Sequence, residues 1–383
     1  MLGTTAIGVE GTPTPIHLRT ARPNFEGVAA LIDRRGEWGN EHDRSSRDQL
    51  LARIAAYLDI PRLPDHQQQD ALTSSRLFVP GDTLDTAALQ QPVGDATILG
   101  GIVPAMFIGT KAITHPLIDD DAARPDRWSM MMAHLMGDAA LTGFTAFSQP
   151  DAARAGRRLL SDGPVRLKSV CGKAGLGQLV VYDEVALDAA LDLEDWDALS
   201  RTGIVIEANL TDVVTYSVGS VQLGGESISY WGSQNLTNDH QGREVYGGSD
   251  LFVVRGDFEA LTVLDLSPSL KRAVQCATTF DRAAQLAYPD VVLTRRNYDV
   301  IEGMDHAGVR RIGVLEQSWR VGGASGAEIA AFEVLRLEPD TTSVRCSTVE
   351  IYDVVNPPAG AIVYYLGVDP VVGAMTKYTV RLV

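Results

Sequence analysis

Hydrophobic residues recur with helical spacing in some stretches of the chain and form short continuous runs in others, and the two kinds alternate near the N-terminus. Residues 45–60 place leucine, isoleucine and alanine on one helical face, behind serine and aspartate residues that suit a helix start. Apolar runs at 27–35, 76–80 and 97–104 are typical of strands. We therefore predict a small α/β layer over residues 20–110.

The middle of the chain continues the alternation and predicts a compact α+β unit near residues 143–210. Before this unit, residues 123–141 have a helical pattern, and we interpret its apolar face as part of the core. That face carries Met130, Met131, Leu135 and Met136. Within the unit, the predicted strands are 143–148, 165–170, 179–182 and 203–210, and the predicted helices are 150–163 and 184–193.

The last third of the chain is rich in predicted strands. Residues 214–236 read as a hairpin joined at Gly224 and Gly225, and residues 298–320 read as a second hairpin that turns at residues 306–308. The other predicted elements are a strand at 251–256, helices at 267–288 and 326–337, and two strands that close the chain.

Composition narrows the classes of protein that fit. Of the 383 residues, 45% are hydrophobic and 21% are charged, as in a globular protein. The formal net charge of −16 would repel the phosphate backbone of a nucleic acid, and no basic stretch offsets it. The most apolar window, residues 97–110, is too short and too interrupted by glycine and proline to span a membrane. We predict neither a nucleic-acid partner nor a membrane partner.

Cysteine and histidine usage indicates no metal-binding cluster. Cys171, Cys276 and Cys346 are odd in number and far apart, which fits a reducing cytoplasm. The N-terminus has no basic segment followed by an apolar one, so we expect no secretion signal and a cytoplasmic protein. His115 and His134 stand singly and are interpreted as packing or hydrogen-bonding residues rather than metal ligands.

A glycine-rich turn follows Lys168. The pattern GxxGxG, with Gly172, Gly175 and Gly177, leaves backbone N–H groups able to approach a polyphosphate beside the lysine. Known phosphate-binding loops precede a helix, whereas this turn precedes a strand. The alternative interpretation is therefore an ordinary β-hairpin that binds no phosphate.

Two carboxylates face each other in the second predicted hairpin. With the turn centred near Ala307, Glu316 lies almost across from Asp299, and strand alternation allows both side chains to share a face. Adjacent carboxylates repel each other unless a cation neutralises them, and Mg²⁺ with phosphate oxygens is a natural partner. The alternative is two exposed acids on a solvated hairpin.

The order of these features resembles the ATP-grasp superfamily. Lys111 follows an apolar run, Lys168 precedes the glycine turn, Glu207 ends a strand, and the acidic hairpin comes last. The resemblance implies an N-terminal α/β pre-grasp domain at 1–110, a small α+β lid region at 111–210 and a larger β-rich C-terminal subdomain at 211–383. The whole chain looks most like a bacterial family of predicted ATP-grasp proteins with no assigned reaction, through TKAITHPL, NYDVIEG, VLEQSWRVGGASGAE and GVDPVVGAMTKY.

The resemblance also implies an ATP site. Lys111 and Lys168 would contact the phosphates, the 172–178 loop would cover them, and the strand from Glu207 to Leu210 would bind adenine. Asp212 is the nearest acid for the ribose. The implied nucleotide-binding residues are Lys111, Lys168, Gly172, Lys173, Gly175, Gly177, Gln178, Glu207, Asn209, Leu210 and Asp212.

The metal site follows the family's Glu-x-Asn-x-Arg ending with one departure. Asp299 and Glu316 would bind Mg²⁺, while Ser318 stands where the family usually has asparagine. Because a serine hydroxyl is a shorter and weaker ligand than an amide oxygen, a second magnesium would be held through water or by Asn297. Arg320 keeps the family's arginine position.

The implied activity is that of an ADP-forming ligase that joins a small-molecule carboxylate to an amine or related nucleophile through an acyl phosphate. Arg320, with Arg295 and Arg296, is a candidate clamp for carboxylate and phosphate, and Lys168 acts with them. A surface ion pair is the alternative for Arg295 and Arg296. A kinase, a carboxylase and a non-catalytic nucleotide-binding regulator remain alternative functions, and a homodimer is left open.

Overall fold

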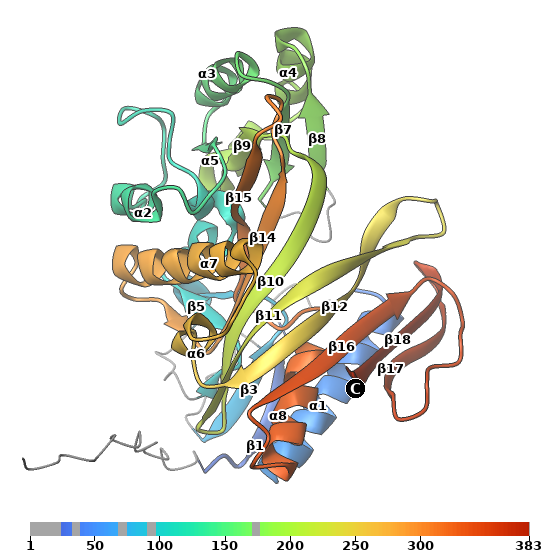
Figure 1. The fold of residues 1–383 in the computed structure, drawn as a ribbon. Coiled ribbons are helices and arrows are strands. Elements are labelled where there is room, and N and C mark those ends of the chain that lie inside the picture. The colour runs from blue at the N-terminus through green and yellow to red at the C-terminus, as the bar shows by residue number, and fades with distance from the viewer. Residues whose placement is uncertain (1–23, 33–38, 68–74, 90–96, 171–176, 383) are drawn as a thin grey trace, which may run out of the picture.

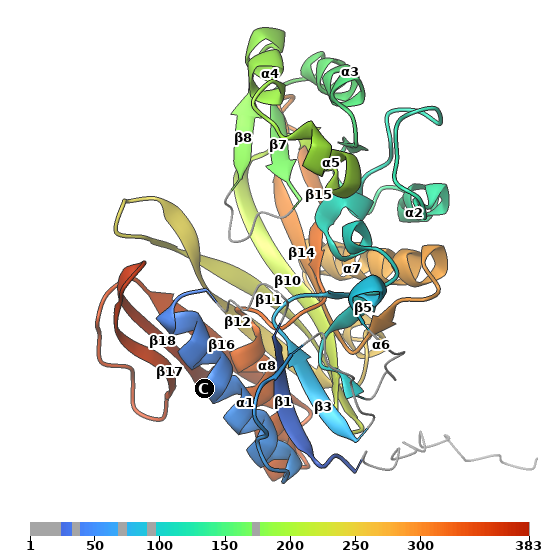
Figure 2. The ribbon, with the colours of Figure 1, turned by 180° about the vertical axis from the view of Figure 1, so that it is seen from behind.

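The computed structural model describes residues 24–32, 39–67, 75–89, 97–170 and 177–382. Its described part contains a parallel N-terminal sheet, a small antiparallel sheet and a long antiparallel sheet, which Figure 1 shows from one side and Figure 2 from behind.

The N-terminal unit is the α/β layer that the alternating pattern predicted. Strand β1 (Gly27–Ile32) lies between β2 (His66–Gln67) and β3 (Arg76–Pro80), and both pairings are parallel. Helix α1 (Glu41–Leu58) connects β1 to β2, as parallel pairing requires. It ends at Asp59, whose backbone is left-handed with φ 57° and whose N–H donates to the last turn.

A second sheet, with one parallel and one antiparallel pairing, has three short strands. Strand β5 (Gly101–Val103) pairs with β4 (Leu84–Asp85) on one side and with β13 (Val292–Leu293) on the other. Strand β13 comes from the last third of the chain, so this sheet joins segments that lie far apart in the sequence. The 3₁₀ segments in the described part of this region are η1 (Thr86–Ala88), η3 (Met106–Gly109) and η4 (Lys111–Thr114).

The predicted α+β unit is present as a four-stranded antiparallel sheet, which lies at the top of Figure 1. Its strands in spatial order are β6 (Gly143–Ala146), β9 (Ile204–Ala208), β7 (Val165–Ser169) and β8 (Gln178–Val181). Its helices are α3 (Gln149–Leu160), α4 (Glu184–Leu191) and α5 (Trp196–Thr202), the last of which the pattern did not predict.

The two faces of this small sheet have different chemistry. Val165 and Leu167 of β7 share a buried cluster with Ala155 and Leu187 of the covering helices. Alternation along a strand places Lys168 on the opposite face, which is turned away from these helices. The sheet therefore presents charged side chains on its inner face.

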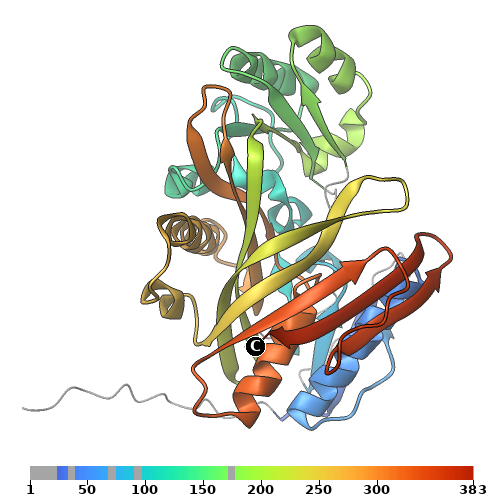
Figure 3. The ribbon, with the colours of Figure 1, turned by 45° about the vertical axis from the view of Figure 1, so that its right-hand side comes forward.

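The long sheet has eight antiparallel strands. Three strands, rather than the predicted two, follow the last helix, and the red strands at its edge are seen best in Figure 3. In spatial order the strands are β15 (Arg310–Ser318), β14 (Arg295–Met304), β10 (Thr211–Leu223), β11 (Glu226–Asn238), β12 (Glu244–Arg255), β16 (Ser343–Ile351), β18 (Gly373–Leu382) and β17 (Ile362–Asp369).

Helices cover the two faces of the long sheet at different ends. Helix α7 (Pro268–Ala287) packs against β10, β14 and β15, with the short helix α6 (Glu259–Thr262) beside it. Helix α8 (Ser325–Leu337) packs against β12, β16 and β18. Figure 1 shows α1 lying next to α8, and the two helices contact each other.

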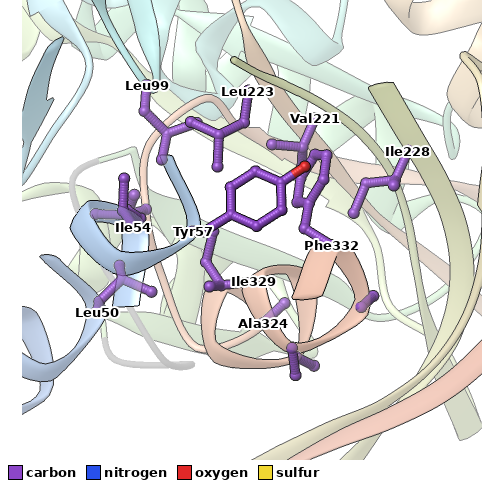
Figure 4. Packing of buried hydrophobic residues seen from close by; sticks show 14 of the residues in the cluster. Leu50, Ile54, Tyr57, Leu99, Val221, Leu223, Ile228, Ala324, Ile329 and Phe332 are labelled. Atoms are coloured by element: carbon purple, nitrogen blue, oxygen red, sulfur yellow. The ribbon is translucent and has the colours of Figure 1, made fainter. Parts of the chain in front are cut away.

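The largest core cluster is shared between the N-terminal unit and the long sheet. Figure 4 shows Tyr57 of α1 with Phe332 of α8 and Val221 of β10 on one side and Ile54 of α1 on the other. The rings of Tyr57 and Phe332 have centroids 5.5 Å apart. Ile54 of α1 belongs to the same cluster. The N-terminal unit and the long sheet are therefore one folded body.

The predicted core face of the methionine helix is only partly correct, because Met136 is buried and Leu135 packs against the core, whereas Met130 and Met131 are exposed. Helix α2 covers only Met130–Met136, and Met130 and Met131 are exposed by 41% and 45%. The buried methionines are Met132 and Met136, which are one turn apart. Packing against α7 buries the side of the helix that carries Met132 and Met136.

Among the described residues, no helix is long and apolar enough to cross a membrane.

Candidate functional site

The acidic hairpin forms with the expected register. Asp299 of β14 lies directly across from Glu316 of β15, and Asn297 lies across from Ser318. A bulge follows Asp299, and the turn lies between Met304 and Arg310. Cross-strand partners point to the same face of a sheet, so the two carboxylates converge.

Asp299 is held by two amide donors. Gln234 Nε2 and Asn297 Nδ2 donate to the same oxygen, Asp299 Oδ1, at 2.8 Å and 3.0 Å. In the described part of the chain, Oδ2 receives no hydrogen bond. Burial and then the charge of Glu316 raise the pKa of Asp299 to about 6. The second oxygen is therefore oriented and available to a cation.

This raised pKa predicts that the free energy of unfolding depends on pH. Between the ordinary pKa near 3.8 and the folded value of about 6, the folded protein holds more protons than the unfolded chain, so stability falls as the pH rises through this window. Without metal, we expect the loss from Asp299 to be on the order of 2 kcal/mol. Thermal melts of wild type and Asp299→Asn at pH 5 and pH 7.5 would measure it. Equal pH dependence in both proteins would contradict the prediction.

Glu316 forms an ion pair with a buried lysine. Lys111 Nζ lies 2.6 Å from Glu316 Oε2, and Lys111 is only 6% exposed. The neighbouring Gln317 fixes this arrangement, because its side-chain amide donates to the carbonyl oxygens of Ile108 and Thr110 at 3.0 Å and 2.6 Å. Segment η4 is thereby anchored to the acidic hairpin.

Lys168 and Glu207 are also brought together. Lys168 Nζ forms an ion pair with Glu207 Oε1, and His115 Nε2 lies 3.0 Å from Glu207 Oε2. All three side chains are buried. Burial acts to raise the pKa of Glu207, but the charge of Lys168 and the hydrogen bond with His115 outweigh it and lower the pKa to about 2.

One short segment connects the two lysine–carboxylate pairs. Lys111 begins η4 and His115 follows its end, so the side chain that contacts Glu316 and the side chain that contacts Glu207 are four positions apart in the sequence. Thr145 of β6 holds this segment, since its hydroxyl donates to Ala112 O at 2.7 Å. The long sheet and the small sheet are joined at this point.

The strand end after Glu207 carries further polar contacts. Asn209 Oδ1 accepts from the Arg166 guanidinium at 2.7 Å, and Arg166 also donates to Gln178 Oε1 at 3.0 Å. The backbone N–H groups of Ala208 and Asn209 donate to other segments, whereas the backbone hydrogen bonds of the described segments include none from Leu210.

Asp212 occupies a distorted part of β10. Its backbone is left-handed with φ 51°, and the register of β10 with β14 shifts between Thr211 and Val214. The Asp212 side chain is exposed. It is therefore accessible close to the strand end at Leu210.

The glycine turn is only partly described. Gly172, Lys173 and Gly175 lie outside the described residues. Gly177 has φ 74°, and its carbonyl accepts from the Ser169 N–H at 2.9 Å, which closes the turn between β7 and β8. Gln178 is then paired with Lys168 across the two strands.

The three arginines of the proposed clamp are not brought together. Arg296 points to the α7 face of the sheet, opposite to Asp299, where it pairs with Asp257 at 2.7 Å and Asp281 at 3.0 Å. Arg295 is on the face of Asp299 but is fully engaged with Glu328 at 2.7 Å. Both pairs are buried, so neither the clamp nor the surface ion pair describes Arg295 and Arg296.

Arg320 remains accessible. Its side chain is 26% exposed, its Nε lies 4.0 Å from Asp82 Oδ1, and its Nη1 donates to Val321 O. Of the three arginines it alone keeps a partly open guanidinium. Ser318, by contrast, faces a cation, because Arg295 Nη1 donates to Ser318 O at 3.0 Å and lies 3.4 Å from Ser318 Oγ.

Comparison with known families matches residues 31–379 to a family described as a protein of unknown function, DUF3182. The chain belongs to this family. No curated protein matches the chain.

Solved structures establish the fold of this DUF3182 protein. The chain is similar to carboxyaminoimidazole ribonucleotide synthase from Aspergillus clavatus complexed with ATP, at 14% identity and a TM-score of 0.50 over 94% of each chain. It is also similar to phosphoribosylamine–glycine ligase from Thermotoga maritima, at 11% identity and a TM-score of 0.50 over 93% of this chain and 90% of the other. The DUF3182 protein therefore has an ATP-grasp fold.

A third similar structure contains a metal complex. It is the biotin carboxylase domain of 2-oxoglutarate carboxylase from Hydrogenobacter thermophilus, in complex with MgADP, ADP and bicarbonate. The identity is 12% and the TM-score is 0.50, over 94% of this chain and 86% of the other. At this identity the similarity establishes the fold alone.

The described part of the DUF3182 protein contains no group of three or more histidine, cysteine, aspartate or glutamate side chains that could hold a metal ion. Asp299 and Glu316 are thus a two-carboxylate site. Mg²⁺ is usually bound through one or two carboxylates together with substrate phosphates, so this donor set fits it.

Sequence reasoning missed the residues that support the site. Gln234 stands three strands away from Glu316 in the sheet, and its contact with Asp299 depends on the twist and order of the strands. Arg166 could have been found, because it lies two positions before Lys168 and alternation places both on one face. His115 was expected to form hydrogen bonds, and its contact with Glu207 confirms this.

Proposed function

We propose that this DUF3182 protein is an ATP- and Mg²⁺-dependent, ADP-forming ligase that joins a small-molecule carboxylate to an amine or related nucleophile. The observation that carries the proposal is the Asp299–Glu316 pair, whose members face each other across one hairpin beside Lys111. Adjacent carboxylates cost stability unless a cation neutralises them. Lys111 already neutralises Glu316, whereas Asp299 forms no ion pair with any described residue, so magnesium bound with a nucleotide would supply the positive charge that Asp299 lacks.

The residues around the small sheet support a nucleotide between it and the long sheet. Lys111 and Lys168 would contact the phosphates, and the turn from Gly172 to Gln178, with Lys173, Gly175 and Gly177, would cover them. Adenine would lie along Glu207, Asn209 and Leu210, where the Leu210 N–H is left for a ring nitrogen. Asp212, exposed on its bulge, would reach the ribose.

Asp299 and Glu316 would hold the magnesium. Asp299 would offer Oδ2, since Oδ1 already accepts two amide hydrogen bonds. Ser318 is a poorer candidate, because Arg295 lies against its hydroxyl. When bound, Mg²⁺ would neutralise charge on the phosphates during phosphoryl transfer.

The proposed reaction has two steps. A carboxylate oxygen of the first substrate attacks the γ-phosphorus, the bond to the β–γ bridging oxygen breaks, and ADP leaves with an acyl phosphate formed. The nucleophile then attacks the acyl carbon, loses a proton, and displaces inorganic phosphate. Arg320, with its accessible guanidinium, would bind the first carboxylate and the transferring phosphoryl group. Arg296 has no part in this scheme because it lies on the other face of the sheet.

Binding of MgATP tests the nucleotide site directly. We expect wild-type protein to bind MgATP in calorimetry and Lys168→Met to bind it about 10- to 100-fold more weakly, because a charge-assisted contact to phosphate is lost. Lys271→Met, at an exposed position on α7, serves as the matched control and should bind like wild type. Wild-type protein that does not bind MgATP would overturn the proposal.

Product analysis separates the ligase from its rivals. With candidate substrates and MgATP, a ligase releases ADP and phosphate with a new amide or ester, a kinase leaves a stable phosphate ester, and a carboxylase consumes bicarbonate. Tight MgATP binding with no ADP formed in any mixture would instead favour a regulatory nucleotide-binding protein.

A further inference from the structure

The number of metal ions that the acidic hairpin can hold depends on three side chains. The sequence predicts a first magnesium at Asp299 and Glu316, and a second one with the help of Ser318 or Asn297. A second ion would have to share Glu316 with the first, because the described residues form no group with a third acid at this place. The contacts of Glu316, Ser318 and Asn297 therefore decide whether the second ion has ligands.

The ammonium of Lys111 occupies one oxygen of Glu316. Its Nζ lies 2.6 Å from Glu316 Oε2, and the lysine is almost completely buried. The side-chain amide of Gln317 donates to Thr110 O at 2.6 Å, which holds the backbone before Lys111 against the hairpin. A magnesium ion at Oε2 would have to displace this ammonium or lie beside it, and two cations at such a short distance repel each other strongly.

The guanidinium of Arg295 lies against Ser318. Its Nη1 donates to Ser318 O at 3.0 Å and lies 3.4 Å from Ser318 Oγ. Arg295 is buried and is held in this position by Glu328, at 2.7 Å. A hydroxyl that faces a fixed cation is a poor ligand for a second cation, so the residue that departs from the family's pattern offers no replacement for the missing amide oxygen.

The amide of Asn297 is turned the wrong way for a metal. Its Nδ2 donates to Asp299 Oδ1 at 3.0 Å, so the nitrogen faces the carboxylate pair. Its Oδ1 lies 2.9 Å from the hydroxyl of Tyr230, which is completely buried in the core shared with α8. The oxygen that could bind a metal therefore points into the protein, and Asn297 orients Asp299 instead.

The position between Asp299 and Glu316 remains suited to a metal. Asp299 Oδ2 and Glu316 Oε1 receive no hydrogen bond from the described residues. Two carboxylates against the one ammonium of Lys111 leave one negative charge uncompensated. One divalent cation reverses that charge, whereas a second would add its charge next to both Lys111 and Arg295.

We propose that the DUF3182 protein binds its nucleotide with a single magnesium ion, and that the ammonium of Lys111 takes the place of a second ion between Glu316 and the phosphates. An ammonium has three N–H donors, so Lys111 can keep its contact with Glu316 while another N–H donates to a phosphate oxygen. No side chain has to leave its partner. This inference rests on the proposed function and specifies the metal content of its site.

A count of bound metal tests the proposal without any substrate. Mn²⁺ accepts the same oxygen ligands as Mg²⁺, and its electron paramagnetic resonance signal reports the free ion. We titrate Mn²⁺ into wild-type protein with an equal concentration of the β,γ-imido analogue of ATP, both well above the dissociation constant of the complex. We expect binding to end at about one Mn²⁺ per nucleotide. Lys271→Met, exposed on α7, should give the same count.

The dependence of nucleotide affinity on free Mg²⁺ is a second measurement that needs no variant. Once all ATP is present as MgATP, a tenfold rise in free Mg²⁺ at constant ionic strength should change the dissociation constant by less than about twofold. A second ion that enters with the nucleotide would instead lower the dissociation constant by up to about tenfold, by mass action. Calorimetry at two Mg²⁺ concentrations distinguishes these results.

A double variant should create the second site. Lys111→Met frees Glu316 Oε2, and Ser318→Asn adds the amide oxygen of the family's pattern, so we expect the count to rise to about two Mn²⁺ per nucleotide. Ser318→Asn alone should keep a count of one, because Lys111 still occupies Glu316. A double variant that folds and still binds one ion would contradict the role assigned to Lys111. The two wild-type measurements decide the metal content even if the double variant does not fold.

The possible results separate this inference from the proposed function. Wild-type protein that binds no MgATP would overturn the proposed function and the inference with it. Two Mn²⁺ ions per nucleotide in wild type, or a tenfold gain in affinity with free Mg²⁺, would overturn the inference and leave the proposed function standing.

Discussion

Replacing Glu328 with glutamine is expected to lower the free energy of unfolding by about 3–5 kcal/mol, the largest stability change that we predict. Glu328 and Arg295 are 2% and 1% exposed, and their side chains form an ion pair in which Arg295 Nε and Nη2 both donate hydrogen bonds to the Glu328 carboxylate. The variant leaves the guanidinium buried without its counter-charge. Urea unfolding followed by circular dichroism would measure the loss.

An exposed ion pair provides the matched control. Glu338 pairs with Arg381 at the surface, so Glu338→Gln should leave the urea midpoint close to that of wild type. If both variants unfold at the same urea concentration as wild type, the buried pair does not carry the stability assigned to it.

The substitution at Glu328 should also affect the proposed magnesium site at Asp299. Tyr230 places its hydroxyl 2.7 Å from Glu328 Oε1 and 2.9 Å from Asn297 Oδ1, and Asn297 in turn donates to Asp299. The buried pair, the tyrosine and the amide thus form one connected network. Its effect on Asp299 is to fix which oxygen faces away from the sheet.

Replacing Asp299 with asparagine is expected to reduce Mg²⁺-dependent ADP formation by about 100-fold or more, because charge stabilisation at the transferring phosphate is lost. The substitution keeps an oxygen for the amides of Gln234 and Asn297, and it removes the repulsion with Glu316. The variant should therefore be folded and at least as stable as wild type in the absence of metal. A Mg²⁺ titration of ADP formation would measure the effect.

Asp305→Asn is the control for this change. Asp305 is an acid in the turn of the same hairpin, where it accepts from backbone N–H groups, and asparagine can take the same position. We expect it to match wild type in ADP formation. An Asp299→Asn variant with the metal dependence of wild type would exclude this carboxylate as a magnesium ligand.

The parts of the fold that the sequence predicted are those governed by local periodicity. The hairpin register of Asp299 and Glu316 follows from the position of the turn and the alternation of a strand, and both are visible in the sequence. The glycine-joined hairpin before it was predicted for the same reason.

The errors have equally specific causes. Arg295 and Arg296 are neighbours on one strand, so their side chains must point to opposite faces, and a shared clamp was excluded by the same alternation. The buried acids that neutralise them, Glu328 and Asp281, come from helices that no local pattern connects to this strand. The core face of α2 was predicted only in part, because three consecutive methionines at residues 130–132 give no local sign of which of them is buried.

The core shared by α1 and α8 bears on how the chain is made. Tyr57 packs against Phe332, and a strand from residues 292–293 completes a sheet that begins at residue 84. During synthesis the first helix emerges long before these partners exist. The part of its apolar face that packs on α8 stays uncovered until most of the polypeptide has left the ribosome, so the shared core is completed only late in synthesis.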